Sequence, residues 1–145
     1  MQLFSLKEPN PPNLRALEVG SVVVTTKGFQ WKLVSRAEED ETWEDFVGGL
    51  TWLPATEEGE TWDHAKDCEN EIQRLPTAKE YEIAERHGIR EILEMDGRWW
   101  WSSSTVPYDH VKARVFNGYE GNFENHYRYP VSSKRYVSRP REKAI

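Results

Sequence analysis

Three consecutive tryptophans, Trp99–Trp101, constrain the fold of this chain more than any other feature. Each tryptophan carries about 150–250 Å² of mostly apolar surface, so the three side chains cannot all face solvent. On a β-strand, Trp99 and Trp101 would share one face while Trp100 takes the other. At least one face of this strand must therefore be buried. The serines at 102–104 end the apolar run and can form hydrogen bonds with a neighbouring loop.

The first third of the domain is predicted to be mostly β-structure. Two apolar runs, 21–26 and 29–34, flank a Lys-Gly pair and predict a β-hairpin. Residues 36–46 are rich in carboxylates and predict an acidic loop or a short helix. Leu50–Leu53 predicts a short strand that ends at Pro54.

Two helices are predicted between residues 61 and 88. Thr61 is an N-cap candidate for the first helix, and Thr77 with Glu80 has the capping-box pattern that begins the second. Gly88 ends the second helix, and residues 89–93 predict one or two further helical turns. The residues expected to face the core at helical spacing are Trp62, Ala65, Cys68 and Ile72 in the first helix and Tyr81 and Ala84 in the second.

The remaining segments divide into strands and termini. Three prolines within residues 1–18 predict an extended arm without regular pairing, residues 19–140 form the domain, and residues 141–145 form a basic tail. Asn117-Gly118 is a turn signal between two late strands. The late strands are predicted at Trp99–Ser103, Val111–Phe116, Gly121–Tyr127 and Arg135–Ser138.

Six short motifs follow one another in an informative order. They are Gly49-Leu50-Thr51-Trp52, Thr61-Trp62-Asp63-His64-Ala65, Cys68-Glu69-Asn70, Arg74-Leu75-Pro76-Thr77 with Glu80, the Trp-Ser-Ser block, and Ala113-Arg114-Val115-Phe116-Asn117-Gly118. Over roughly residues 45–139 this order resembles the family named after the C-terminal domain of the Legionella collagen-like adhesin. The resemblance implies an α+β fold, a single C-type-lectin-like domain with two main helices packed on antiparallel β-strands. The residues expected in its core are Trp52, Trp62, Tyr81, Trp101 and Val115.

Cysteine content distinguishes this chain from the family that it resembles. Relatives often pair the cysteine of the first helix with one in the last strand, but residues 134–139 contain none. Cys68 therefore cannot form an intrachain disulfide, which suits a reducing compartment. The start of the chain has no basic region followed by an apolar one, so we expect no signal peptide and a cytoplasmic location at synthesis.

Net charge and hydropathy narrow the classes of partner. The net charge of −6 argues against nucleic-acid binding, which usually requires a basic patch. The sequence contains no apolar run near the roughly 20 residues that span a bilayer, so we expect no membrane insertion. Carboxylates cluster at 37–41 and 57–60. They suit a solvated surface, or an acidic surface that binds a partner.

Metal binding and catalysis are not predicted. Glu8-Pro9-Asn10 matches the triplet of calcium-dependent lectins, but it lies near the N-terminus instead of in a late loop. His64 and Cys68 are four residues apart and could reach one metal ion, although no further ligands are evident at a suitable spacing. A thiol nucleophile also needs a positioned base, and none is evident for Cys68. We expect no cofactor, no metal and no enzymatic activity.

The best binding candidate is the segment after the triple tryptophan. It is rich in tyrosine and in short amides, as recognition loops are, although an ordinary strand pair would explain the same residues. We expect non-catalytic binding of a glycan or protein, as in an adhesin or a virion-associated receptor-binding protein from a phage. The alternative is an intracellular interaction or inhibitory protein that presents an acidic surface to a host factor; a homo-oligomer is compatible with either. The candidate ligand-binding residues are Tyr108, Asp109, Tyr119, Asn122, Asn125 and Tyr127.

Overall fold

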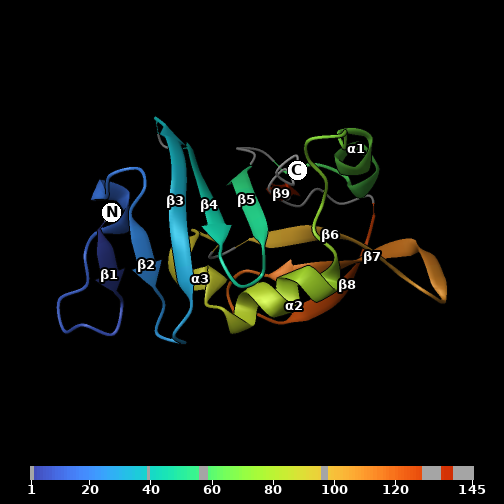
Figure 1. Cartoon of the computed structure of the whole chain (residues 1–145). Coiled ribbons are helices and arrows are strands. Elements are labelled where there is room, and N and C mark those ends of the chain that lie inside the picture. The colour runs from blue at the N-terminus through green and yellow to red at the C-terminus, as the bar shows by residue number, and fades with distance from the viewer. Residues whose placement is uncertain (1, 39, 56–58, 96–97, 129–134, 139–145) are drawn as a thin grey trace, which may run out of the picture.

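Two β-sheets and several short helices make up the described part of the chain (Figure 1). The computed structural model describes residues 2–38, 40–55, 59–95, 98–128 and, for the backbone, 135–138. The mixed α+β class predicted from the sequence is confirmed.

The larger sheet has six strands in the order β1-β2-β3-β4-β5-β9. β1 runs parallel to β2, and the other neighbouring strands are antiparallel. The chain between β5 and β9 holds the α-helices and the second sheet. Because β9 pairs with β5, this part of the chain leaves the larger sheet and returns to it at neighbouring strands. The strands are β1 (Leu3–Ser5), β2 (Val22–Val24), β3 (Gln30–Ala37), β4 (Asp40–Asp45), β5 (Leu50–Ala55) and β9 (Arg135–Ser138).

The predicted hairpin around Gly28 is confirmed as β2 and β3. Val22 pairs with Lys32, and Val24 pairs with Gln30. The backbone of Gly28 has φ of 89°, a left-handed conformation that glycine adopts without the steric cost of a Cβ atom. This is why the turn forms at the Lys-Gly pair.

The acidic loop or short helix predicted at residues 36–46 is wrong, because the segment forms the end of β3 and all of β4. Buried residues alternate with more exposed ones along this strand, as expected when successive side chains point to opposite faces of a sheet. The buried residues are Glu41, Trp43 and Asp45. Glu41 is paired with two arginines and Asp45 with a histidine. Pairing allows both carboxylates to lie inside the protein.

β5 also continues through Pro54 to Ala55, past the strand end predicted from the sequence. The pairing of β5 with β9 is irregular between Trp52 and Ala55. An irregular ladder accommodates a proline, which has no backbone N–H to donate.

The N-terminal residues 1–18 were predicted to lack regular pairing, and this is wrong for residues 3–5, which form β1 beside β2. A 3-10 helix, η1 (Leu14–Ala16), follows, and Leu17 is buried in the main core. The three prolines lie between β1 and η1, so they interrupt regular structure only there.

The helices begin where the sequence predicts. Thr61 caps α1 (Trp62–Asp67), but this helix ends before Ile72, whose side chain is 70% exposed. The expectation that Ile72 faces the core is therefore wrong. Thr77 and Glu80 form the predicted capping box of α2 (Ala78–Arg86), and α3 (Ile89–Ile92) follows as predicted. Gly88, with φ of 88°, separates α2 from α3.

The smaller sheet contains β6 (Trp99–Val106), β7 (Asp109–Asn117) and β8 (Phe123–Tyr127) in that order, all antiparallel. These strands confirm the three late strands predicted upstream of β9. Their serines also reach a neighbouring loop: the Ser103 amide donates to the Pro76 carbonyl at 2.8 Å, and Ser104 Oγ accepts from the Ala78 amide at 2.9 Å.

The core lies on both faces of β6. Trp100 packs in the larger cluster with Trp52, Tyr81 and Phe116, and Trp101 packs in a smaller cluster beneath α1. Tyr81 stacks on Phe116 at 4.9 Å between ring centroids. The five predicted core residues are all buried: Trp52, Trp62, Tyr81, Trp101 and Val115.

The described helices are all too short or too polar to span a lipid bilayer.

Candidate functional site

The predicted binding residues lie on the smaller sheet, but they do not form one site. Nine residues of β7 separate its two ends by about 26 Å, at roughly 3.3 Å per residue. Asn125 lies between these ends, on the middle of β8, where it pairs with Arg114. The first end holds Tyr108, Asp109 and Tyr127, and the second holds Tyr119 and Asn122.

We call Tyr108, Asp109, Lys112 and Tyr127 the hairpin-tip surface. Pro107 and Tyr108 form the two-residue turn between β6 and β7, and proline suits the first of these turn positions. The Tyr108 side chain is 98% exposed and that of Tyr127 is 54% exposed. Lys112 Nζ lies 4.9 Å from the Tyr127 ring centroid and 3.6 Å from Asp109 Oδ2. The tip thus presents two aromatic rings beside a carboxylate and an ammonium group.

The second end of the sheet is a local turn. Asn117 Oδ1 accepts hydrogen bonds from the amides of Tyr119 (2.8 Å) and Glu120 (3.1 Å). Asn122 Nδ2 donates to Glu120 Oε2 at 3.1 Å, and Arg90 Nη1 donates to the Tyr119 carbonyl at 2.8 Å. The side-chain amide of Asn122 therefore already has a hydrogen-bond partner within the turn. The Tyr119 side chain, in contrast, is 69% exposed.

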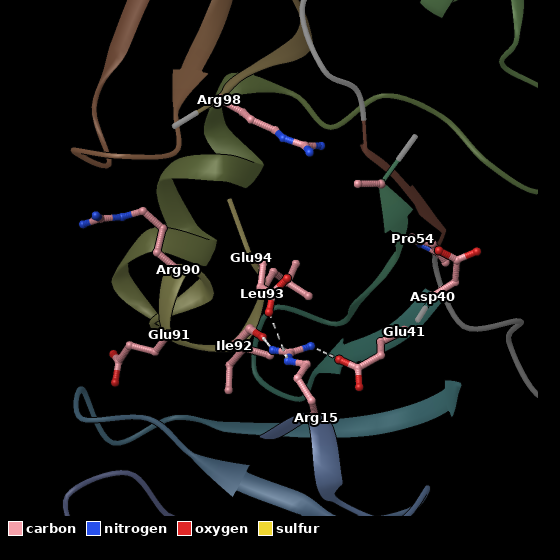
Figure 2. A pocket seen from close by; sticks show the side chains of 11 residues that line it. Arg15, Asp40, Glu41, Pro54, Arg90, Glu91, Ile92, Leu93, Glu94 and Arg98 are labelled. Carbon is pink, nitrogen blue, oxygen red and sulfur yellow. Dashed lines mark hydrogen bonds and ion pairs between the residues drawn. The ribbon is translucent and has the colours of Figure 1, made fainter. Parts of the chain in front are cut away.

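A polar pocket of about 570 Å³ lies where η1, β4, β5 and α3 approach one another (Figure 2). The sequence analysis did not identify it, because its residues come from distant segments and match no motif. Its lining consists of guanidinium and carboxylate groups with a few apolar side chains: Arg15, Asp40, Glu41, Pro54, Ala55, Arg90, Glu91, Ile92, Leu93, Glu94 and Arg98.

Arg15 lines one side of this pocket, opposite Arg98 in Figure 2. Its Nη2 donates to the Ile92 carbonyl at 2.6 Å, Nη1 pairs with Glu41, and Nε lies 3.6 Å from Glu94 Oε1. Burial lowers the pKa of the Arg15 guanidinium; Glu94 opposes this shift and Arg36 adds to it. An arginine still remains charged at neutral pH. Arg15 therefore uses its donors to join η1 to β4 and α3.

Glu41 is committed to the same internal network. Arg36 Nε donates to Glu41 Oε2 at 2.7 Å, and Trp43 Nε1 lies 3.3 Å from Glu41 Oε1. In Figure 2, Arg98 extends toward the open centre of the pocket and Arg90 points away from it. The contacts of Arg15 and Glu41 in this pocket are made to other parts of the same chain, so these two residues join β4 to η1, β3 and α3.

A buried His87–Asp45 pair is a second feature that sequence reasoning missed. His87 Nδ1 lies 2.6 Å from Asp45 Oδ2, and both side chains are buried. Phe29 stacks on the His87 ring at 4.1 Å, and the Gly48 amide donates to Asp45 Oδ1 at 3.1 Å. The pair joins α2 to β4, and a stacked, buried imidazole of this kind serves to satisfy buried polar groups.

The polar residues of α1 have separate partners. Asp63 pairs with Arg128, and His64 Nδ1 lies 2.5 Å from Glu60 Oε2. The possible ligand atoms of Glu60, His64 and Cys68 all lie within 4.8 Å of one another. Glu60 precedes the helix, so the spacing of His64 and Cys68 within the predicted helix did not include it.

Two further sequence candidates have no built site in the described residues. Glu8 and Asn10 are exposed in the loop after β1. Of the acidic residues in the alternative binding surface, Glu39, Glu57 and Glu58 lie outside the described residues.

The chain matches none of the protein-family models and none of the curated proteins against which it was compared. Its function must be argued from the residues themselves.

Proposed function

We propose that this chain is a non-catalytic recognition domain that binds a glycan or protein through the hairpin-tip surface. The observation that carries the proposal is the exposure of Tyr108, 98% at the tip of the β6–β7 hairpin. The turn itself requires a suitable backbone, which Pro107 favours, and gains nothing from an aromatic ring in solvent. An aromatic residue held in this position suits contact with another molecule.

The chemistry of the surface supports recognition more than catalysis. Tyrosine offers a large, flat contact area and loses little side-chain entropy on binding. Tyr127 and Tyr108 would contact sugar rings or apolar side chains, while Asp109 and Lys112 would fix hydroxyl, amide or charged groups. Because Asp109 and Lys112 already pair with each other at 3.6 Å, their charges are partly balanced before a ligand arrives.

We also propose that the fold is C-type-lectin-like, as the motif order implies. Supporting this, β5 and β9 pair and enclose α1, α2 and a three-stranded sheet between them. The scaffold is thus built by the helices and the paired strands, and the late turns project from it. Loops on a rigid scaffold commonly carry binding residues. An adhesin-like or virion-associated receptor-binding role is the biological setting that we propose.

The test is a glycan array together with a pull-down from candidate host extracts, each run at low and high salt. Tyr108→Ser and Tyr127→Ser should each weaken binding by over about 1 kcal/mol if these residues are hot spots. Tyr119→Ser is the matched control, because it removes an exposed tyrosine from the opposite end of the sheet. Binding to a glycan or a purified protein should therefore fall for the two tip variants and stay unchanged for Tyr119→Ser.

The acidic-surface alternative makes a different prediction. Its binding should collapse at high salt, because ion pairs between exposed groups are screened, and with charge reversal at Glu38, Glu39, Glu57 and Glu58. Binding that survives both tip substitutions and fails after the acidic reversals would refute the proposed role of the hairpin-tip surface.

A further inference from the structure

We propose that Glu60, His64 and Cys68 form a binding site for one divalent cation of the zinc class. Their ligand atoms, one carboxylate oxygen, one imidazole nitrogen and one sulfur, all lie within 4.8 Å of one another. The sequence led us to expect no metal because only His64 and Cys68 were recognised as a pair. Glu60, which lies two residues before the start of α1, supplies the third ligand.

The set of ligands selects the type of ion. Thiolate sulfur and imidazole nitrogen favour Zn²⁺ and related transition metals, whereas Ca²⁺ and Mg²⁺ prefer oxygen ligands alone. A carboxylate and a thiolate together balance the two charges of the ion, and the thiol proton leaves to solvent when the metal binds. Three protein ligands would leave a fourth, solvent-facing position, as in open zinc sites.

Helix geometry and one side-chain contact bring the three residues together. His64 lies in α1 and Cys68 is its C-cap, four residues later, so their side chains share one side of the helix. Glu60 precedes the Thr61 N-cap, and its Oε2 lies 2.5 Å from His64 Nδ1. Ligand atoms in a tetrahedral zinc site lie about 3.5 Å apart, given metal–ligand bonds of about 2.0–2.3 Å. Since the side chain of His64 is 61% exposed, it can move the required ångström or so without disturbing the core.

The backbone at each ligand is held in place. The buried indole of Trp101 donates to the Glu60 carbonyl at 2.7 Å, and the Thr61 hydroxyl accepts from the His64 amide at 3.3 Å. The Cys68 amide donates to the His64 carbonyl at 3.2 Å, and Gln73 Nε2 donates to the Cys68 carbonyl at 3.2 Å. These contacts limit the rearrangement that metal binding would require.

Lys66, on the same helix, has partners outside the three proposed ligands. Lys66 Nζ pairs with Glu69 Oε1 at 2.5 Å and lies 5.9 Å from the Trp62 ring centroid. Lys66 is therefore committed to Glu69 and Trp62, while the imidazole of His64 faces the Glu60 carboxylate at 2.5 Å.

The experiment is a titration of the full chain with Co²⁺, a spectroscopic substitute for Zn²⁺, in a non-thiol reductant. We expect a thiolate-to-cobalt charge-transfer band that saturates at one ion per chain, and its loss when Zn²⁺ is added. Cys68→Ser should abolish the band. Glu60→Gln and His64→Ala should each weaken Co²⁺ binding at least about tenfold, the lower end of the range for outer-shell changes at metal sites.

Asp67→Asn is the matched control, because it removes an exposed carboxylate from the same helix outside the ligand set. It should bind Co²⁺ as the wild type does, and far-UV circular dichroism should show that all four variants are folded. Absence of the band at stoichiometric Co²⁺ would overturn the proposal. So would one ion per two chains, a band that persists in Cys68→Ser, or unchanged affinity in Glu60→Gln or His64→Ala.

Discussion

Replacing Trp101 with alanine should remove a large part of the stability of this protein. The Trp101 side chain is 0% exposed and packs under α1. At about 25 cal/mol per Å², burial of about 150–250 Å² corresponds to an upper estimate of about 4–6 kcal/mol. Measured Trp→Ala changes in cores cost about 3–5 kcal/mol, against about 5–15 kcal/mol for a whole domain. Urea unfolding followed by far-UV circular dichroism measures the loss.

Two further variants separate the causes of this loss. The Trp101 indole donates to the Glu60 carbonyl, so Trp101→Phe keeps an aromatic ring but loses this hydrogen bond and some volume. We expect it to cost about 1–3 kcal/mol. Tyr108→Ala, at an exposed position, should stay within about 0.5 kcal/mol of the wild type. Equal unfolding midpoints for Trp101→Ala and Tyr108→Ala would contradict our assignment of Trp101 to the core.

Three other substitutions test elements of the fold, each by urea unfolding. Thr77→Ala removes one half of the α2 capping box and should cost about 0.5–2 kcal/mol without changing ligand affinity; no change in midpoint would contradict the cap. Glu41→Ala leaves Arg15 and Arg36 without their shared carboxylate and should cost about 1–3 kcal/mol, because both arginines are partly exposed to water. Gly88→Ala should cost over about 1 kcal/mol, since φ is 88° and the new Cβ would lie 2.7 Å from Thr25 Cβ; a variant as stable as the wild type would refute this strain.

Local signals were read correctly where one strong residue determines the structure. Gly28 and Gly88 each have a positive φ, and the Thr77–Glu80 pair makes both hydrogen bonds of a capping box. These preferences arise within a few residues and need no knowledge of the tertiary structure. Area alone predicts that at least one face of the Trp99–Trp101 strand is buried, because exposing three adjacent tryptophans is costly, but area does not say which face.

The errors arose where distant residues decide the outcome. Carboxylates at 41 and 45 predict a solvated segment, yet β4 buries both of them. Glu41 pairs with Arg36, five residues away across the β3–β4 turn, and with Arg15 from η1, while Asp45 pairs with His87, 42 residues away in sequence. Pairing over such separations has no short-range signature, so residue type alone indicates the wrong environment.

The same limit applies to the candidate sites. Tyr108 could be identified from the sequence because it lies in a segment rich in tyrosine and short amides, the composition of recognition loops. Glu60 was not recognised as a partner of His64 and Cys68, since it precedes the predicted Thr61 N-cap and so lies outside the helical spacing that relates those two residues. The polar pocket required η1, β4 and α3 to be placed against one another, which depends on the Arg15 contacts.

The position of the tip relative to the core explains how recognition and stability can be separated in this chain. Trp100 and Trp101 connect β6 to the larger sheet and to α1, respectively. Beyond them, the pairing of β6 with β7 is irregular on both sides of Thr105, and the hairpin extends away from the body at the right of Figure 1. Tyr108 therefore contributes no core burial, and its replacement leaves the scaffold intact. The buried Trp101 stabilises the fold, whereas the exposed Tyr108 does not. If Tyr108→Ser weakens ligand binding, the loss therefore reflects a lost contact with the ligand and not a loss of folded protein.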